Sequence, residues 1–193
     1  LPDLEAAESR VAQQLAERDR EGLLAIALLH ESSYRDYRDV DHRLLARHSR
    51  DRIRSLGELY LKSGGPGEKV TALFASLGAS LQASGVTASA NALFERALTL
   101  QPDHPGALIA LAVYFEKTGQ YGAAVPLLRR LVDSHPAHQQ GWLRLGTNLR
   151  RLGKPKEAAR ALRQVAEGGG DRWLRSLAFQ ELAMLEIDDK RWQ

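Results

Sequence analysis

The side chains of this sequence that could do chemistry are six histidines and scattered carboxylates, serines and arginines. His135 and His138 are three residues apart, a spacing at which two imidazoles can face one metal ion. Pro136 lies between them, however, and Asp133 is the only nearby carboxylate with ligand spacing. We therefore expect solvent-exposed histidines at a junction between helices, and no metal site.

The sequence contains no combination of residues typical of an enzyme. It has no cysteine, which excludes disulfides, thiolate metal sites and cysteine nucleophiles. No serine lies in a nucleophile-elbow motif. Asp36, Asp39 and Asp41 alternate with arginines, which is typical of an ion-paired surface. We expect a protein without catalytic residues, cofactor or metal.

A glycine-rich segment at residues 63–69 superficially suggests a phosphate-binding loop. Such a loop needs a contiguous Gly-Lys-Ser/Thr after a strand. Here Glu68 separates Gly67 from Lys69, and Val70 replaces the hydroxyl residue. The segment therefore indicates a break between two regions of the chain, not a nucleotide site.

Arginines gather on one helical face, at Arg47, Arg50 and Arg54, and in pairs at 129–130 and 150–151. The whole chain is nearly balanced, with 27 basic and 24 acidic residues and a net charge of +3. Nucleic-acid binding requires a surface of one sign and stacking aromatics, and aromatics are 6% here. Nucleic acid is thus an unlikely partner and remains a second alternative.

The composition is that of a soluble globular protein, with 44% hydrophobic and 26% charged residues. The longest apolar run, residues 23–29, is far too short to span a membrane. The sequence does not distinguish a cytoplasmic from a periplasmic location. Its high content of Ala, Leu and Arg favours a bacterial source. Because the last repeat is unfinished at Gln193, we expect that the natural protein continues or has a disordered tail. The start at Leu1 in place of Met indicates a cleaved or shortened chain.

The elements that position these side chains repeat every 34 residues. Large apolar residues recur at offsets of three and four, which predicts one face of a helix. A glycine then ends the first helix of each unit, and small residues let the second helix approach closely. The columns are Phe74, Leu108 and Trp142; Leu77, Leu111 and Leu145; Gly78, Ala112 and Gly146; Leu81, Phe115 and Leu149; Gly85, Gly119 and Gly153; Ala90, Ala124 and Ala158; and Phe94, Leu128 and Leu162.

These units resemble the tetratricopeptide repeat. The resemblance implies an all-α fold, an α-solenoid of about 3.5 helix-turn-helix units preceded by a helical N-terminal region. Units two and three depart from the pattern at Leu131 and Val165, and unit three has glycines at 168–170 where a proline is expected. Pro126 should bend its helix, whereas Pro155 suits a first helical position.

The expected organisation has two parts. Residues 1–63 form a helical region that caps the array or serves as a dimerisation or partner arm. It contains a helix or bent pair over 3–30, with Val11, Leu15, Leu23, Ile26 and Leu29 inward, and a helix over about 40–61, with Leu44, Leu45, Ile53, Leu56 and Leu59 inward. The array covers 68–193, with units near 71–104, 105–138 and 139–175 and a partial unit at 176–193 that begins with Phe179 and Leu182.

The family resemblance implies a non-catalytic scaffold that binds a protein or peptide in the groove lined by the first helices. The implied groove residues are Ala75, Ala79, Ile109, Val113, Lys117, Leu143, Arg144, Thr147, Arg150 and Arg151. A clamp for a terminal carboxylate is not expected, since only Arg144 matches it. We predict an apolar peptide with an acidic flank held by Arg144, Arg150 and Arg151. The main alternative is the non-catalytic arm of an enzyme with its catalytic domain outside this chain; self-association also stays open.

Overall fold

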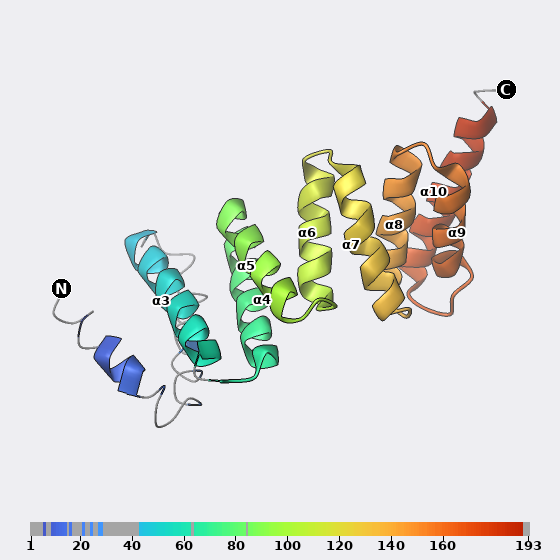
Figure 1. The fold of residues 1–193 in the computed structure, drawn as a ribbon. Coiled ribbons are helices and arrows are strands. Elements are labelled where there is room, and N and C mark those ends of the chain that lie inside the picture. Colours follow the sequence, from blue (N-terminus) through green and yellow to red (C-terminus); the bar gives the residue numbers. More distant parts are fainter. Residues whose placement is uncertain are drawn as a thin grey trace. The chain divides into compact units, whose positions relative to one another are not determined.

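The computed structural model describes residues 6, 9–14, 16, 21, 24, 27–28, 43–62, 64–83 and 85–190. Within these ranges every regular element is an α-helix, so the predicted all-α fold class is confirmed (Figure 1). The helices are α3 (Arg43–Lys62), α4 (Gly67–Ala83), α5 (Thr87–Leu100), α6 (Pro105–Lys117), α7 (Tyr121–Ser134), α8 (Gln139–Arg151), α9 (Pro155–Ala166) and α10 (Arg172–Lys190).

The chain divides into two compact units, Leu1–Pro102 and Asp103–Gln193. The first contains α3, α4 and α5, and α4 packs mainly against α5. The second contains two helical hairpins, α6–α7 and α8–α9, followed by α10, which packs on α9 and α8 (Figure 1). The helix-turn-helix pairs are those of an α-solenoid.

Each predicted helix-ending glycine adopts the left-handed conformation. Gly85, Gly119 and Gly153 have φ values of +78°, +74° and +70°. At the second of them, the Gly119 amide donates to the Glu116 carbonyl at 3.0 Å and the Gln120 amide donates to the Phe115 carbonyl at 2.8 Å. This paired pattern satisfies carbonyls that the helix end leaves free, so the glycine turns of the repeat are confirmed.

The small residues of the repeat lie where two helices touch. A Cβ added to Gly146 on α8 would lie 2.5 Å from Cγ of Leu162 on α9. A Cβ added to Gly78 on α4 would lie 2.7 Å from Cε1 of Phe94 on α5. Ala112, the equivalent residue on α6, has no exposed surface. The predicted close approach of paired helices is therefore confirmed.

The N-terminal region differs in part from the prediction. On α3, Ile53 and Leu56 are buried as expected, and Tyr60 is fully buried as well. Val11 is 52% exposed, whereas its neighbour Ala12 is buried, so the inward face was predicted one residue out of register there. The predicted positions Leu15, Leu23, Ile26 and Leu29 lie outside the described residues, as do the side chains of Leu44 and Leu45.

The partial fourth unit also has another register than the one predicted. Phe179 is 54% exposed, while Ala178 beside it is fully buried against the preceding helices. The helix begins at Arg172, and this start places Ala178 and Leu185 on the packed side. The inward position expected for Phe179 assumed three extra residues after the glycines at 168–170 and was wrong. The buried Ala178 follows the buried Leu145 of α8 by 33 residues, which is close to the repeat length.

Candidate functional site

Three polar side chains fix the starts of the helices that carry the site, α6, α8 and α10. His104 Nδ1 accepts a hydrogen bond from the Ala107 amide at 3.2 Å, and His138 Nδ1 accepts from the Gly141 amide at 3.0 Å. Asp171 Oδ1 does the same for the Trp173 amide, at 2.7 Å. His138 lies at a junction, as the sequence predicted, but it is a half-buried N-cap and not a solvent-exposed side chain, and His104 caps the start of α6 in the same way.

The capping role of His104 requires that Nδ1 carries no proton, because this nitrogen accepts the hydrogen bond from the Ala107 amide. Burial lowers the pKa of His104 below its usual value, and the nearby charge of His135 lowers it further. A positive charge there would also oppose the dipole of α6. The start of α6 is therefore built for the uncharged ring.

Gln139, the first residue of α8, holds the start of α10. Its Oε1 accepts a hydrogen bond from the Asp171 amide at 3.0 Å. The preceding glycine turn lies so close that a Cβ added to Gly170 would overlap the Gln139 amide at 1.8 Å. The glycines that replace the expected proline thus allow the turn to pack on Gln139.

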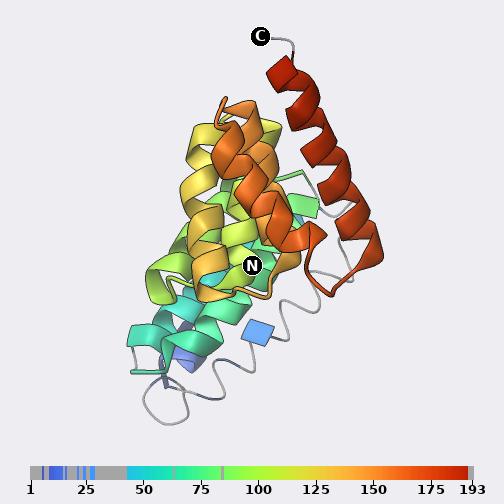
Figure 2. The same ribbon diagram turned by 90° about the vertical axis from the view of Figure 1, so that its right-hand side faces the viewer.

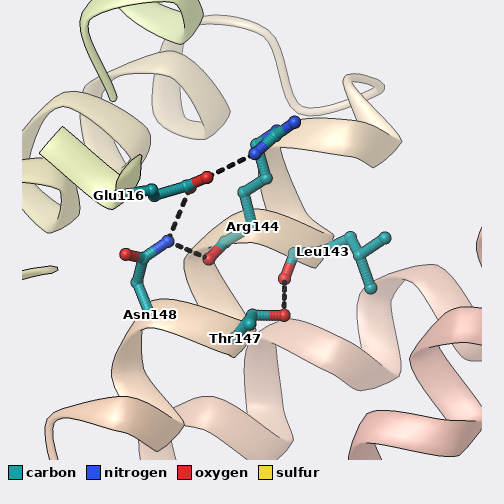
Figure 3. Close-up of polar contacts among 5 residues, drawn as sticks. All are labelled: Glu116, Leu143, Arg144, Thr147 and Asn148. Carbon is teal, nitrogen blue, oxygen red and sulfur yellow. Dashed lines mark hydrogen bonds and ion pairs between the residues drawn. The ribbon is translucent and has the colours of Figure 1, made fainter. Parts of the chain in front are cut away.

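A polar cluster joins α6 to α8 (Figure 3). Arg144 Nη1 donates to Oε2 of Glu116, and Asn148 Nδ2 donates to Oε1 of the same carboxylate at 2.7 Å. Asn148 Nδ2 also donates to the Arg144 carbonyl at 2.7 Å, and Thr147 Oγ1 donates to the Leu143 carbonyl at 3.1 Å. Asn148 is 1% exposed, so its amide is a fixed part of the site. Asn148 was not among the predicted site residues.

The other two predicted arginines also have partners in this unit. Arg150 Nε lies 2.8 Å from Oε2 of Glu181 on α10. The Arg151 guanidinium stacks 5.1 Å from the ring centroid of Tyr121, and its Nη1 donates to the Tyr121 hydroxyl at 3.2 Å. Among the described residues Tyr121 is the only partner of the Arg151 side chain, which is exposed. Arg151 therefore retains donors for an acidic ligand.

The cluster borders a pocket of about 330 Å³ within this unit. Leu143, Leu174 and Leu177 give the pocket an apolar side, and Trp173 stands at its margin, 66% exposed. The complete lining is Glu116, Tyr121, Gln140, Leu143, Arg144, Thr147, Asn148, Arg151, Trp173, Leu174, Leu177 and Glu181. The pocket thus has apolar and hydrogen-bonding walls, as ligand pockets do.

The pocket brings together four of the predicted groove residues, Leu143, Arg144, Thr147 and Arg151. The remaining predicted residues do not line it. Ile109 and Val113 are half-buried on α6, Lys117 is exposed at its end, and Arg150 is turned to Glu181. Ala75 and Ala79 lie on α4 in the first unit, half-buried and exposed, respectively.

The first unit has its own cavity, of about 600 Å³, between residues of α3 and α5. Glu58 on α3 and Arg96 on α5 form a paired ion bridge there, with both N–O distances 2.8 Å. The hydrogen bond from Arg96 lowers the pKa of Glu58 below its usual range. Arg50 and Arg54 also line the cavity, beside Asp51 and Glu95, so its charges balance.

Metal and membrane sites were sought in the part of the chain that the structure describes. No group of three or more histidine or acidic residues there could hold a metal ion. No described helix combines the length and apolar character needed to cross a membrane.

Comparison with known proteins agrees with this architecture. Two tetratricopeptide repeat family models match, over residues 76–139 and 140–167. MamA, residue 41 to the end, from Desulfovibrio magneticus RS-1 superposes with a TM-score of 0.57 at 19% identity, covering 83% of this chain and 86% of that chain. MamA AMB-1 superposes with a TM-score of 0.55 at 23% identity, covering 84% of this chain and 91% of that chain.

The crystal structure of YrrB, described as a tetratricopeptide repeat protein with an unusual peptide-binding site, has a TM-score of 0.52 at 16% identity and covers 92% of this chain and 97% of that one. No curated protein sequence matches the chain. The chain therefore matches the tetratricopeptide repeat family over residues 76–167, where the two models follow one another. Proteins built from this repeat are typically non-catalytic.

Proposed function

We propose that the second unit binds an extended peptide on the face formed by α6, α8 and α10, as a non-catalytic scaffold. The observation that carries this proposal is the pocket of about 330 Å³, which opens between an apolar wall and a fixed polar cluster. A pocket of this size accepts one large side chain with its adjacent backbone. The peptide-binding site named for YrrB supports a peptide as the ligand class.

The apolar wall selects the side chain that enters. Leu143 is 9% exposed, and Leu177 is half-buried, so both present carbon surface without being free in solvent. Burying a leucine- or phenylalanine-sized side chain there contributes about 2 kcal/mol. We infer that the ligand carries a bulky apolar residue at this point.

The polar walls select what flanks that residue. Glu116 is already bound by Arg144 and Asn148, and Glu181 by Arg150, so neither carboxylate needs a cation from the ligand. Arg151 has only the Tyr121 ring and hydroxyl as partners within the described residues. A carboxylate on the ligand would form a charge-assisted hydrogen bond with this guanidinium. We infer an acidic neighbour on that side.

A selection from a random peptide library displayed on phage tests the proposal. The purified chain should enrich peptides with a bulky apolar residue next to Asp or Glu. Arg151→Glu should remove the acidic preference, while Arg160→Glu, an exposed arginine on α9 outside the pocket, should keep it. No enrichment, or the same acidic preference in both variants, would show that this face is not the binding site.

A further inference from the structure

The starts of two helices in the second unit are connected by side-chain hydrogen bonds. His138 Nδ1 accepts a hydrogen bond from the Gly141 amide at 3.0 Å and so caps α8. Gln139, the next residue along the chain, accepts a hydrogen bond from the Asp171 amide through Oε1 at 3.0 Å. The residue that follows the cap of α8 therefore holds the residue that precedes α10.

The last link of this connection positions one wall of the pocket. Asp171 Oδ1 accepts hydrogen bonds from the amides of Trp173 at 2.7 Å and Leu174 at 3.2 Å, and both of these residues line the pocket. Leu177, three residues further along α10, lines it too. Figure 2 shows the turn after α9 that leads into the start of α10, and the Gln139 side chain lies so close to this turn that a Cβ at position 170 would overlap it. The apolar wall therefore begins at a point that Gln139 fixes.

The imidazole of His138 is the group in this connection that belongs to a residue type titrating near neutral pH. An amide such as that of Gln139 does not titrate, and carboxylates as a class lose their charge only at lower pH. A proton on Nδ1 would remove the lone pair that accepts from the Gly141 amide, and it would place a positive charge at the positive end of the α8 dipole. The cap of α8 is therefore complete at neutral pH and is lost as the pH falls.

The charged surroundings of His138 do not oppose this change. The charged and titratable side chains at the neighbouring helix ends are His104 before α6, Asp133 and His135 at the end of α7, Glu167 after α9, and Asp171 and Arg172 at the start of α10. Within the described part of the chain, none of them forms an ion pair or a hydrogen bond with the His138 ring. The protonation of this ring is thus linked to its hydrogen bond with the Gly141 amide.

We propose that His138 is a pH-sensitive positioning residue for the peptide pocket. Its protonation frays the start of α8, frees Asp171 from Gln139 and loosens the wall that α10 contributes. Peptide affinity then falls about three- to tenfold between pH 7.5 and pH 5.5, which is the range that the loss of one helix cap allows. The effect on affinity rests on the proposed function, whereas the effect on α10 does not.

The cap of α6 provides a matched control. His104 also caps a first helix, and it lies 34 residues before His138. The residue of α6 that lines the pocket, Glu116, lies in the last turn of that helix, far from the cap. Removing the titrating group at His104 should therefore leave the pH response of α10 unchanged.

Amide hydrogen exchange of the full chain tests the link to α10 without any peptide. At pH 5.5, fragments that cover residues 172–180 should exchange faster in the parent chain than in His138→Asn, and at pH 7.5 the two proteins should exchange equally. Asparagine caps a helix well and does not titrate, and comparing proteins at one pH cancels the intrinsic effect of pH on exchange. His104→Asn should exchange like the parent chain at both pH values. Equal exchange of the parent chain and His138→Asn at pH 5.5 would overturn the proposal.

Isothermal titration with a peptide enriched in the phage selection tests the effect on affinity. The parent chain should bind this peptide about three- to tenfold more weakly at pH 5.5 than at pH 7.5, and His138→Asn should bind it equally at both. His138→Ala and Gln139→Leu should bind it weakly at both pH values, because each breaks the connection to α10. An unchanged pH dependence in His138→Asn would overturn the role of His138. Faster exchange of α10 without any enriched peptide would reject the peptide site while supporting the link from His138 to α10.

Discussion

Arg144 on α8 donates to the carboxylate of Glu116 on α6, and Asn148 on α8 binds the other oxygen of that carboxylate at 2.7 Å. The three side chains belong to consecutive repeats, and Arg144 and Asn148 follow Glu116 by 28 and 32 positions in the sequence. They hold the first helices of two hairpins together at the floor of the pocket. The face proposed to bind a peptide is therefore preorganised by side chains that carry opposite charge.

The Glu116 cluster should show strong coupling in a double-mutant cycle. Arg144→Met alone should lower the free energy of unfolding by about 1–2 kcal/mol, because it leaves a half-buried carboxylate with one donor fewer. Glu116→Gln with Arg144→Met should cost less than the sum of the two single changes. Urea unfolding followed by circular dichroism measures each value, and additive single changes would contradict the coupling.

Gly146 should not tolerate a methyl group. Gly146→Ala is expected to cost about 1–3 kcal/mol, because the new Cβ would collide with Leu162 across the α8–α9 contact. The matched change Gly122→Ala on α7, where nothing lies within 4 Å of the added Cβ, should be neutral or stabilising by about 0.5 kcal/mol. The change in the midpoint of thermal unfolding is measured for both variants. Equal changes would mean that α8 and α9 can move apart without loss of stability.

The cap formed by His104 should make stability depend on pH. Its pKa is lowered in the folded chain, so its contribution is present above the unfolded value of about 6.5 and is lost as the pH falls below it. His104→Asp keeps a capping oxygen and should make the loss of stability between pH 7 and pH 5 smaller. His138 is present in both the parent chain and the variant, so any contribution from it cancels in the comparison. If the urea midpoints of the two proteins fall in parallel as the pH is lowered from 7 to 5, His104 does not have this role.

Glu58 should contribute in a lower pH window. Because its pKa is lowered by Arg96, its contribution is present above the unfolded value of about 4.5 and is lost as the pH falls below that value. Glu58→Gln should lower stability at pH 7 by at most about 1 kcal/mol, since the pair is partly exposed. The difference between the variant and the parent chain should shrink as the pH falls below that value, and a constant difference would argue for a packing effect instead.

The turns and the close helix contacts of this fold could be predicted from sequence because they depend on single residues. Glycine is favoured at positive φ, and the 34-residue column of Gly85, Gly119 and Gly153 falls at such positions. Pro155 lies at the first position of α9, as its lack of an amide hydrogen suggested. These features need no knowledge of the rest of the chain.

The partners of the charged side chains could not be predicted in the same way. The sequence showed Arg144, Arg150 and Arg151 on one helix, but their contacts lie on α6, α10 and α7. Which carboxylate or ring an arginine contacts depends on the position and orientation of the neighbouring helical hairpins. The repeat pattern of apolar residues does not specify that geometry. The exposure of Phe179 was also not predicted, because the sequence of the glycine turn at 168–170 does not indicate at which residue α10 begins.

The helix α10 contains the single sulfur atom of the sequence. There is no cysteine and one methionine, Met184, whose side chain is 42% exposed. Labelling the chain with ¹³C-methyl methionine would therefore give one resonance, which reports on this helix alone. Peroxide would convert the same thioether to a polar sulfoxide, so a single chemical modification makes this part of the helix surface polar without altering a residue.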